Sequence, residues 1–408
     1  MSNHIESFDY VVVGSGIAGD AAVRGIRSRD RAGSLLVLTK DPDGAYSRPT
    51  LSKALWRDPD TTVGSVRLHD VEAASEVRAD EVVEIDTISH TLATAAGDRV
   101  GFGKLVLATG GTPRALGGAT GGGVPASDRV IYYRTLADYR RLRTLADAGK
   151  HVVVAGGGFI GTELAAALRG TGAPVTFVIS GATVGDAVYP DEISGHLDEV
   201  YRAQGVDVRA RARVVEVREH ADGVSVGLEG GEVLTADGVV LGLGIEPDVA
   251  LARAAELEVD GRGVVVDDHL QTSDPAVYAA GDIAAFLDPV FGRRRVEHED
   301  AASTQGETAG RNAAGGDETY DRVPFFYSDL FDDGYEALGR LDASLTTVVD
   351  WKTPGSEAVV YYLDDDSVLQ GVLLWNVWGD DEHDTKAMAR ALLDDRSPRA
   401  AGDLVGRI

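Results

Sequence analysis

The chain carries the same glycine pattern twice, each time between an apolar run and a stretch with helical spacing. FDYVVV (8–13) precedes the first copy and HVVVA (151–155) precedes the second. The glycines are Gly14, Gly16 and Gly19 in the first copy and Gly156, Gly158 and Gly161 in the second. A buried strand, a G-x-G-x-x-G loop and a helix N-terminus form the phosphate-binding start of a dinucleotide-binding unit. The three glycines allow, in order, a tight turn, close approach of phosphate to backbone N–H groups, and close packing of helix on strand.

The segments after each loop also repeat in order: a second strand, a small antiparallel meander and a closing apolar strand. In the first copy a helix is predicted at 17–29, followed by strands at 34–39, 81–86, 90–95, 98–102 and 105–110; in the second copy the helix 162–170 precedes strands at 175–180, within 213–235 and at 239–247. Such self-similarity indicates an internal duplication of about 100 residues per copy. The fold class expected is therefore α/β with two Rossmann-like dinucleotide-binding domains.

Residues 320–408 differ in character, because they are rich in aromatic residues and in short alternating runs such as TTVVDW and AVVYYL. A helix is predicted near 384–394. We expect a smaller C-terminal α+β domain here, with Trp375 and Trp378 in its core.

Cysteine is absent from the chain. This excludes structural disulfides, a CxxC redox pair, a thiolate nucleophile and cysteine-ligated iron–sulfur clusters. Redox chemistry must therefore reside on a bound organic cofactor or a partner protein, and no metal site is predicted.

The net charge of −27 argues against general nucleic-acid binding and against docking on anionic membranes. No apolar run is long enough to span a bilayer, and no charged-then-apolar leader precedes the first strand. A cytoplasmic location is expected.

Taken together, the motifs resemble those of the two-dinucleotide flavoprotein reductases of the glutathione reductase type. Within them the chain is most similar to the group without redox cysteines, which contains the ferredoxin, rubredoxin and putidaredoxin reductases and apoptosis-inducing factor. The resemblance is carried by both glycine loops and by RPTLSK, LATGGTPR, TSDPAVYAAGD, FGRRRVEH and FYSDLFDDGYEALG. It implies FAD-binding segments at 1–115 and 247–319, an NAD(P)H-binding domain at 116–246 and a C-terminal domain at 320–408.

The resemblance also implies roles for individual residues. FAD would be held by Gly14, Gly16, Gly19, Asp41, Arg48, Lys53, Thr109, Arg114, Asp282, His298 and Tyr327. Gly156, Gly158 and Gly161 would hold the nicotinamide dinucleotide. Glu163 would face the flavin and pair with Lys53, and Phe159 would cover the ring where the nicotinamide stacks; these three would be the catalytic residues.

Each of these assignments has a plainer alternative. Lys53 and Glu163 are otherwise a surface lysine and a helix-turn acid, although buried side by side they would compensate each other's charge. Phe159 is otherwise a core residue. His298, within VEHED, is otherwise a solvated or hydrogen-bonded histidine.

Two positions depart from the usual pattern. Lys40 stands where an acid usually binds the first ribose, which leaves Asp41, slightly late, as the candidate. The strand of the second copy ends in Ser180-Gly-Ala-Thr183, with neither the acid typical of NAD binding nor an arginine for NADP. NADH is preferred here because no basic residue is placed to meet a 2′-phosphate.

The resemblance implies an FAD-dependent NAD(P)H oxidoreductase that reduces a small iron–sulfur carrier such as ferredoxin or rubredoxin. A slow NADH-binding redox sensor and a direct NAD(P)H oxidase or quinone reductase are the alternatives, and a homodimer is possible. Because such carriers are acidic, docking would need a basic patch. Arg293, Arg294 and Arg295 are candidates, unless they are tied to the chain's own carboxylates.

Overall fold

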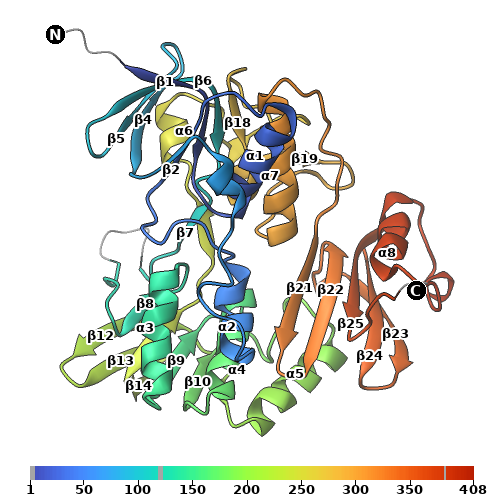
Figure 1. Ribbon diagram of the computed structural model, residues 1–408. Coiled ribbons are helices and arrows are strands. Elements are labelled where there is room, and N and C mark those ends of the chain that lie inside the picture. The colour runs from blue at the N-terminus through green and yellow to red at the C-terminus, as the bar shows by residue number, and fades with distance from the viewer. Residues whose placement is uncertain (1–4, 118–122, 381–382) are drawn as a thin grey trace. The chain divides into compact units, whose positions relative to one another are not determined.

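The computed structural model describes residues 5–117, 123–380 and 383–408. The chain forms two compact units, each assembled from separate stretches (Figure 1). Unit 1 comprises 1–48, 62–112 and 246–324, and unit 2 comprises 49–61, 113–245 and 325–408. The short strands β7 (Gly111–Pro113) and β16 (Ile245–Pro247) pair with each other where the chain passes between the units.

The main sheet of unit 1 follows the order β3-β2-β1-β6-β5-β4, with β18 also paired to β6. Its strands are β1 (Glu6–Val13), β2 (Leu35–Thr39), β3 (Glu76–Ala79), β4 (Val82–Asp86), β5 (Thr91–Thr94), β6 (Arg99–Leu107) and β18 (Val277–Ala279). Strand β6 is parallel to β1 and β18 and antiparallel to β5. A three-stranded sheet, β17 (Val264–Val265), β19 (Ala284–Asp288) and β20 (Gly292–Arg294), completes the unit's strands.

Strand β6 corrects one prediction, because the segments 98–102 and 105–110 are one continuous strand, Arg99–Leu107. Gly103 does not interrupt it. A Cβ there would press on the backbone of Asp9 in β1, so glycine serves the close approach of two strands rather than a break.

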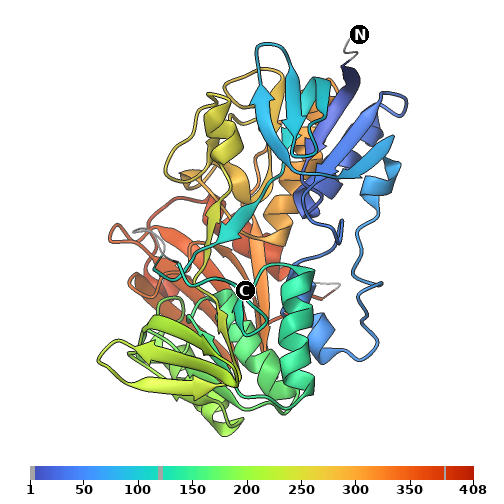
Figure 2. The same ribbon diagram turned by 90° about the vertical axis from the view of Figure 1, so that its left-hand side faces the viewer.

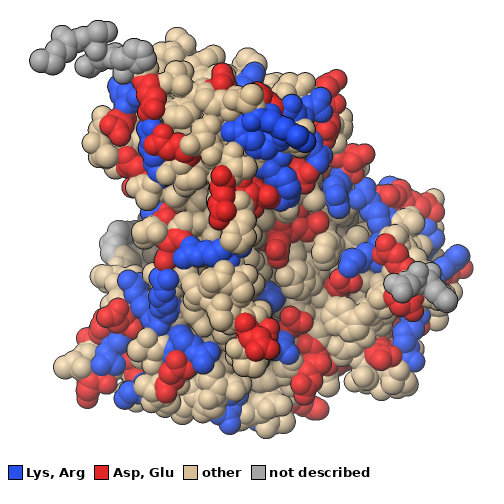
Figure 3. Space-filling view, viewed as in Figure 1, with Lys and Arg blue, Asp and Glu red and all other residues tan. Residues whose placement is uncertain are grey.

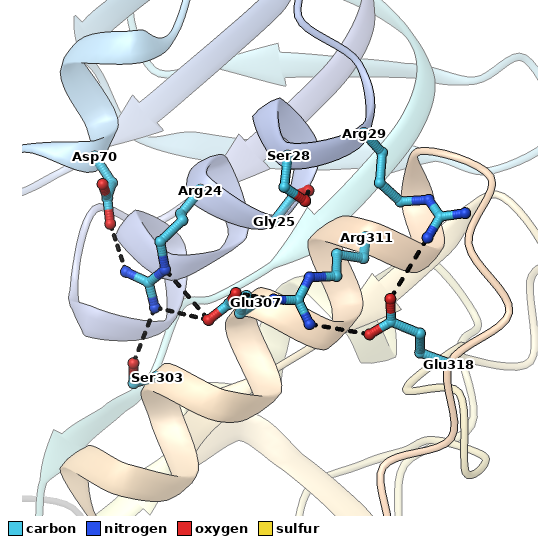
Figure 4. Close-up of polar contacts among 9 residues, drawn as sticks. All are labelled: Arg24, Gly25, Ser28, Arg29, Asp70, Ser303, Glu307, Arg311 and Glu318. Atoms are coloured by element: carbon cyan, nitrogen blue, oxygen red, sulfur yellow. Dashed lines mark hydrogen bonds and ion pairs between the residues drawn. The ribbon is translucent and has the colours of Figure 1, made fainter.

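Helix α1 (Ile17–Arg29) lies beside α7 (Glu299–Ala313) in unit 1 (Figure 4). A Cβ at Gly25, Gly306 or Gly310 would collide with a backbone carbonyl of the facing helix, so the two backbones are close. Ion pairs edge this contact, from Arg24 to Asp70 and Glu307 and from Arg311 and Arg29 to Glu318. The described part of the unit also contains α6 (Ala250–Ala254), η2 (Asp70–Ala73) and η4 (Gly281–Ile283).

Unit 2 contains a parallel sheet in the order β11-β10-β9-β15-β8. Its strands are β8 (Val130–Tyr132), β9 (Val152–Ala155), β10 (Val175–Val178), β11 (Asp207–Arg209) and β15 (Gly238–Leu241). The meander β12 (Val214–His220), β13 (Gly223–Leu228) and β14 (Val233–Ala236), yellow-green in Figure 2, shares a hydrophobic cluster with this sheet that includes Val153 and Val226. Among its described residues, the helices outside the C-terminal part are η1 (Pro49–Leu51), α2 (Ala54–Arg57), α3 (Leu136–Asp147), α4 (Phe159–Gly170) and α5 (Asp191–Ala203).

The C-terminal part of unit 2 is an antiparallel sheet in the order β21-β22-β25-β24-β23. It comprises β21 (Phe325–Leu330), β22 (Asp333–Gly339), β23 (Thr346–Thr353), β24 (Glu357–Leu363) and β25 (Leu369–Trp375), with α8 (Thr385–Asp394) and η5 (Ala401–Asp403). Trp375 is buried as predicted, but Trp378 is 54% exposed. That prediction was wrong because Trp378 lies three residues past the end of β25, whose residues are all buried.

Over the described ranges, no helix combines the length and apolarity needed to cross a bilayer.

Candidate functional site

The first glycine loop, in unit 1, has a backbone that only glycine accommodates. Gly14 has φ +109°, and a Cβ there would collide with the carbonyl of Ala108. A Cβ at Gly19 would collide with the carbonyl of Gly14. Gly16 is the N-cap of α1 and has no side-chain cap, so the first N–H groups of the helix are left to bind an anion.

Arg48 lies over this loop, because its guanidinium occupies the space that a Cβ of Gly16 would enter. It is 3.8 Å from the Asp41 carboxylate and 5.3 Å from the ring centroid of Tyr46. The Tyr46 hydroxyl donates to Asp41 at 2.5 Å. Lys40 instead pairs with Asp248 at 3.0 Å. The structure thus brings Asp41 and Arg48 together and directs Lys40 elsewhere.

Three further predicted residues of unit 1 make internal contacts. The Thr109 hydroxyl donates to the backbone carbonyl of Asp248 at 3.0 Å. Asp282 lies in η4, and its backbone carbonyl accepts a hydrogen bond from the Arg295 guanidinium at 3.3 Å. His298 is the N-cap of α7, and its Nδ1 accepts the Asp300 N–H at 3.4 Å. His298 is therefore hydrogen-bonded, as its alternative assignment states. Its position near the flavin stays a prediction.

The second glycine loop, in unit 2, repeats the geometry of the first. Gly156 has φ +111°, and its Cβ would collide with the carbonyl of Gly242; a Cβ at Gly161 would collide with the carbonyl of Gly156. Gly158 is the N-cap of α4, again without a side-chain cap. The duplication seen in the sequence thus extends to individual close contacts, and α4 offers the same kind of anion site as α1.

Helix α4 places Glu163 beside Lys53, the N-cap residue of α2. The Lys53 Nζ lies 2.8 Å from Glu163 Oε1, and the exposed fractions of the two side chains are 12% and 3%. The surface alternative is therefore wrong for Lys53, and Glu163 is a buried acid of α4. An ion pair withdrawn this far from water needs each charge to be compensated.

Two serines complete the surroundings of the Glu163 carboxylate. The Ser52 hydroxyl donates to Oε2 at 2.5 Å, and the Ser328 hydroxyl donates to Oε1 at 2.7 Å. Both serines are buried. The carboxylate thus receives three donors, which holds its orientation and offsets its desolvation.

The segment that carries Ser52 and Lys53 is anchored at Leu51. The Leu51 carbonyl accepts a hydrogen bond from Trp56 Nε1 at 2.6 Å and a second one from the Tyr133 hydroxyl. Burial raises the pKa of Tyr133 well above its usual value, so the phenol remains protonated and keeps donating.

Aromatic residues lie next to the pair. Lys53 Nζ is 5.4 Å from the ring centroid of Tyr327, within cation–π range. Phe159 is 49% exposed, with its ring centroid 6.2 Å from that of Phe326. The core-filling alternative for Phe159 is therefore wrong, and the ring at the start of α4 is available to a ligand.

The last predicted residues are Arg114 and the three arginines at 293–295. Arg114 is exposed, and its backbone N–H donates to the Gly244 carbonyl at 3.0 Å. In unit 1, Arg293 donates to the carbonyls of Val266 and Ala285. The neighbouring arginines pair with acids, Arg294 with Asp288 and Arg295 with Glu297. The alternative is confirmed: this triplet is tied into the chain's own groups.

Sequence reasoning missed Ser52 and Ser328 as parts of this site. Ser52 stands inside RPTLSK, so its position directly before Lys53 was a usable signal. Ser328 lies 165 residues from Glu163 in the chain, and no local pattern marks it.

Comparisons with known proteins show the family to which the chain belongs. The model of the pyridine nucleotide-disulphide oxidoreductase family matches residues 8–306. The chain is 34% identical to the ferredoxin–NAD(+) reductase component of the anthranilate 1,2-dioxygenase system of Burkholderia cepacia, over 83% of this chain and 84% of that protein. It is 31% identical to apoptosis-inducing factor 1, mitochondrial, of Dictyostelium discoideum, over 92% and 77% of the two chains.

Solved structures extend the similarity to the whole fold. The covalent putidaredoxin reductase–putidaredoxin complex matches with a TM-score of 0.86 and 29% identity, covering 98% of this chain and 95% of that one. The ferredoxin reductase of the CYP199A2 system from Rhodopseudomonas palustris matches with a TM-score of 0.80 and 31% identity, covering 90% and 91%. The predicted α/β class with two dinucleotide-binding folds is confirmed.

Proposed function

This chain belongs to the pyridine nucleotide-disulphide oxidoreductase family, and from that membership we propose that it carries electrons from NADH to a small iron–sulfur protein of the ferredoxin type. It is an oxidoreductase whose cofactors are FAD and NAD(P)H. When bound, FAD supplies the redox chemistry, taking a hydride from the nicotinamide and releasing electrons to an acceptor. The chain lacks the cysteines that a disulfide reaction of its own would need.

We assign the FAD site to segments 1–115 and 247–319 and the NAD(P)H site to 116–246. The glycine backbones at Gly14 and Gly156 and the uncapped starts of α1 and α4 fit the pyrophosphate groups of two dinucleotides. Asp41 and Arg48 near the first loop suit ribose and phosphate, and we keep Thr109, Arg114, Asp282, His298 and Tyr327 as proposed FAD contacts.

The Lys53–Glu163 pair is the observation that carries the proposal. A buried ammonium held by a buried carboxylate is a fixed positive group, suited to stabilising negative charge on a reduced flavin. Ser52 and Ser328 hold Glu163, and Glu163 in turn sets the position of Lys53. We propose Phe159 as the ring that covers the nicotinamide site.

The relatives that support a ferredoxin-type acceptor are named as ferredoxin–NAD(+) reductase components, from Burkholderia cepacia and from the p-cumate 2,3-dioxygenase system of Pseudomonas putida. Putidaredoxin reductase of Pseudomonas putida, 31% identical, adds to this support. In Figure 3, basic side chains are interspersed with acidic ones, although the net charge is −27. Docking of an acidic carrier therefore rests on local groupings of Lys and Arg, and the triplet 293–295 is already engaged.

The apoptosis-inducing factor relative supports a second candidate, a slow redox sensor. The discriminating quantity is turnover, since a sensor reoxidises slowly with every acceptor, whereas a direct oxidase or quinone reductase needs no carrier protein. We keep a cytoplasmic location and a possible homodimer as parts of the proposal.

The test is steady-state NADH oxidation with cytochrome c as final acceptor, with and without a ferredoxin from the same source. Strong stimulation by ferredoxin supports the proposal. Absence of stimulation, with a persistent long-wavelength absorption band after NADH addition, favours the sensor. Fast oxygen or quinone consumption without any carrier favours the direct oxidase.

A further inference from the structure

Strand β10 ends next to the second glycine loop, since the Gly156 N–H donates to the Val178 carbonyl at 3.0 Å. In dinucleotide-binding units this strand end meets the adenosine ribose. An acid there hydrogen-bonds the 2′-hydroxyl of NAD, or a nearby arginine takes the 2′-phosphate of NADP. Residues 180–183 supply neither group.

The structure brings an acid back to this strand end from further along the chain. Asp186 Oδ2 accepts the backbone N–H groups of Ala182 at 2.5 Å and Thr183 at 3.5 Å. The carboxylate fills the space beside Gly181, where a Cβ would collide with it. Glycine at 181 therefore makes room for the carboxylate of Asp186 at the position where a strand-end acid is otherwise found.

The second oxygen of this carboxylate, Oδ1, lies against Gly181, nearest to the position that a Cβ there would take. Both backbone hydrogen bonds end on Oδ2, and no donor among residues 5–117, 123–380 and 383–408 reaches Oδ1. Two backbone N–H groups fix the carboxylate, so little side-chain freedom is lost when a hydroxyl binds.

We propose that Asp186 is the residue that makes the protein select NADH, by accepting a hydrogen bond from the adenosine ribose and repelling a 2′-phosphate. The inference rests on the proposed NAD(P)H site and names the group that sets its specificity. A phosphate monoester carries a charge of about −1.5 to −2 at pH 7, so placing it against a fixed carboxylate is unfavourable.

A cation also lies near this strand end. The Arg211 backbone N–H donates to the Gly181 carbonyl at 2.7 Å, and the residue is exposed with φ +52°. Arg209 in β11 is already paired with Asp207 and Glu232. Arg211 is therefore the rival residue, which would bind the 2′-phosphate if the protein preferred NADPH.

The test is calorimetric binding of two fragments, ADP-ribose and 2′-phospho-ADP-ribose, to the FAD-loaded protein. Asp186→Asn retains an oxygen for the two backbone N–H groups but loses the charge. The control is Asp222→Asn, in the exposed turn between β12 and β13 of the same unit. Arg211→Gln tests the rival group.

We expect the wild type to bind ADP-ribose at least about tenfold more tightly than the phosphorylated fragment, and Asp186→Asn to reduce that ratio about tenfold. Asp222→Asn and Arg211→Gln should preserve the ratio, and the KM values for NADH and NADPH should change in parallel with it. A wild-type preference for the phosphorylated fragment overturns the inference, as does an unchanged ratio in Asp186→Asn or binding of neither fragment. The calorimetric experiment contains no electron acceptor, so its binding ratio does not depend on ferredoxin. Failure of ferredoxin to stimulate turnover would therefore contradict the proposed function alone.

Discussion

Replacing Lys53 with methionine should leave a buried carboxylate without its counter-charge. Glu163 is 3% exposed and pairs with Lys53 at 2.8 Å. Removing one partner of a buried pair costs about 3–5 kcal/mol. Because Ser52 and Ser328 still donate to Glu163, we expect the lower end, a loss of about 3 kcal/mol in the free energy of unfolding.

The double variant Lys53→Met/Glu163→Gln removes both charges. The amide oxygen introduced by Glu163→Gln still accepts one serine hydroxyl, so most of the lost free energy of unfolding should be recovered. A double-mutant cycle, which compares the double variant with the two single variants, should give a coupling energy of about 2 kcal/mol. Lys150→Met is the matched control. That lysine pairs with Asp237 at 3.1 Å but is 49% exposed, and its loss should cost less than about 1 kcal/mol.

Tryptophan fluorescence suits this measurement because all four tryptophans of the chain, Trp56, Trp351, Trp375 and Trp378, lie in unit 2 with the pair. Urea unfolding at constant excess FAD keeps the contribution of the cofactor equal between variants. Two results would refute the claim that Lys53 and Glu163 compensate each other's buried charge. Lys53→Met would lower the free energy of unfolding no more than Lys150→Met does, or the double-mutant cycle would show no coupling.

Three further predictions follow from other contacts. Burial raises the pKa of Asp20 to about 6, so the folded state binds a proton more tightly than the unfolded state does. This difference stabilises the folded state below about pH 4, and the stabilisation is lost as the pH rises through 6. Asp20→Asn should therefore raise the free energy of unfolding at pH 7.5 by about 1–3 kcal/mol and flatten its pH dependence between 4 and 6, as measured by denaturant titration. Gly310→Ala should lower the free energy of unfolding by about 1–3 kcal/mol and weaken the retention of FAD, because the added Cβ would collide with the Ala22 carbonyl. Gly195→Ala in α5 is the control, and it should be neutral or stabilising because no atom of the described residues lies near the added Cβ. Phe159→Ala should change the free energy of unfolding by less than about 0.5 kcal/mol, because the ring is half exposed, while raising the KM for NADH several-fold; an unchanged KM would remove the ring from the nicotinamide site.

The glycine loops were predictable because their function imposes local backbone geometry. Gly14 and Gly156 need positive φ and have no room for a Cβ, and these demands fall on residues adjacent in sequence. The Lys53–Glu163 contact followed from the family resemblance, since 110 positions separate the two residues and no periodicity links them. The C-terminal helix at 384–394 was predicted within one residue of α8 (Thr385–Asp394).

The features that sequence reasoning missed depend on tertiary contacts. Ser328 lies in β21 and reaches Glu163 in α4 across a long separation in sequence. The contact of Asp186 with Gly181 could not be predicted from the sequence, because it depends on a turn that returns the carboxylate to the strand end. Trp378 is an apolar side chain outside the core, a placement that hydrophobicity alone does not reveal.

The most direct test of electron delivery to a carrier is a rapid-mixing measurement under anaerobic conditions. The FAD-loaded protein is reduced with one equivalent of NADH and then mixed with oxidised ferredoxin from the same source, while flavin absorbance is followed. We predict reoxidation at least as fast as steady-state turnover and far faster than with oxygen. Reoxidation that is equally slow with ferredoxin, quinone and oxygen would contradict a carrier reductase.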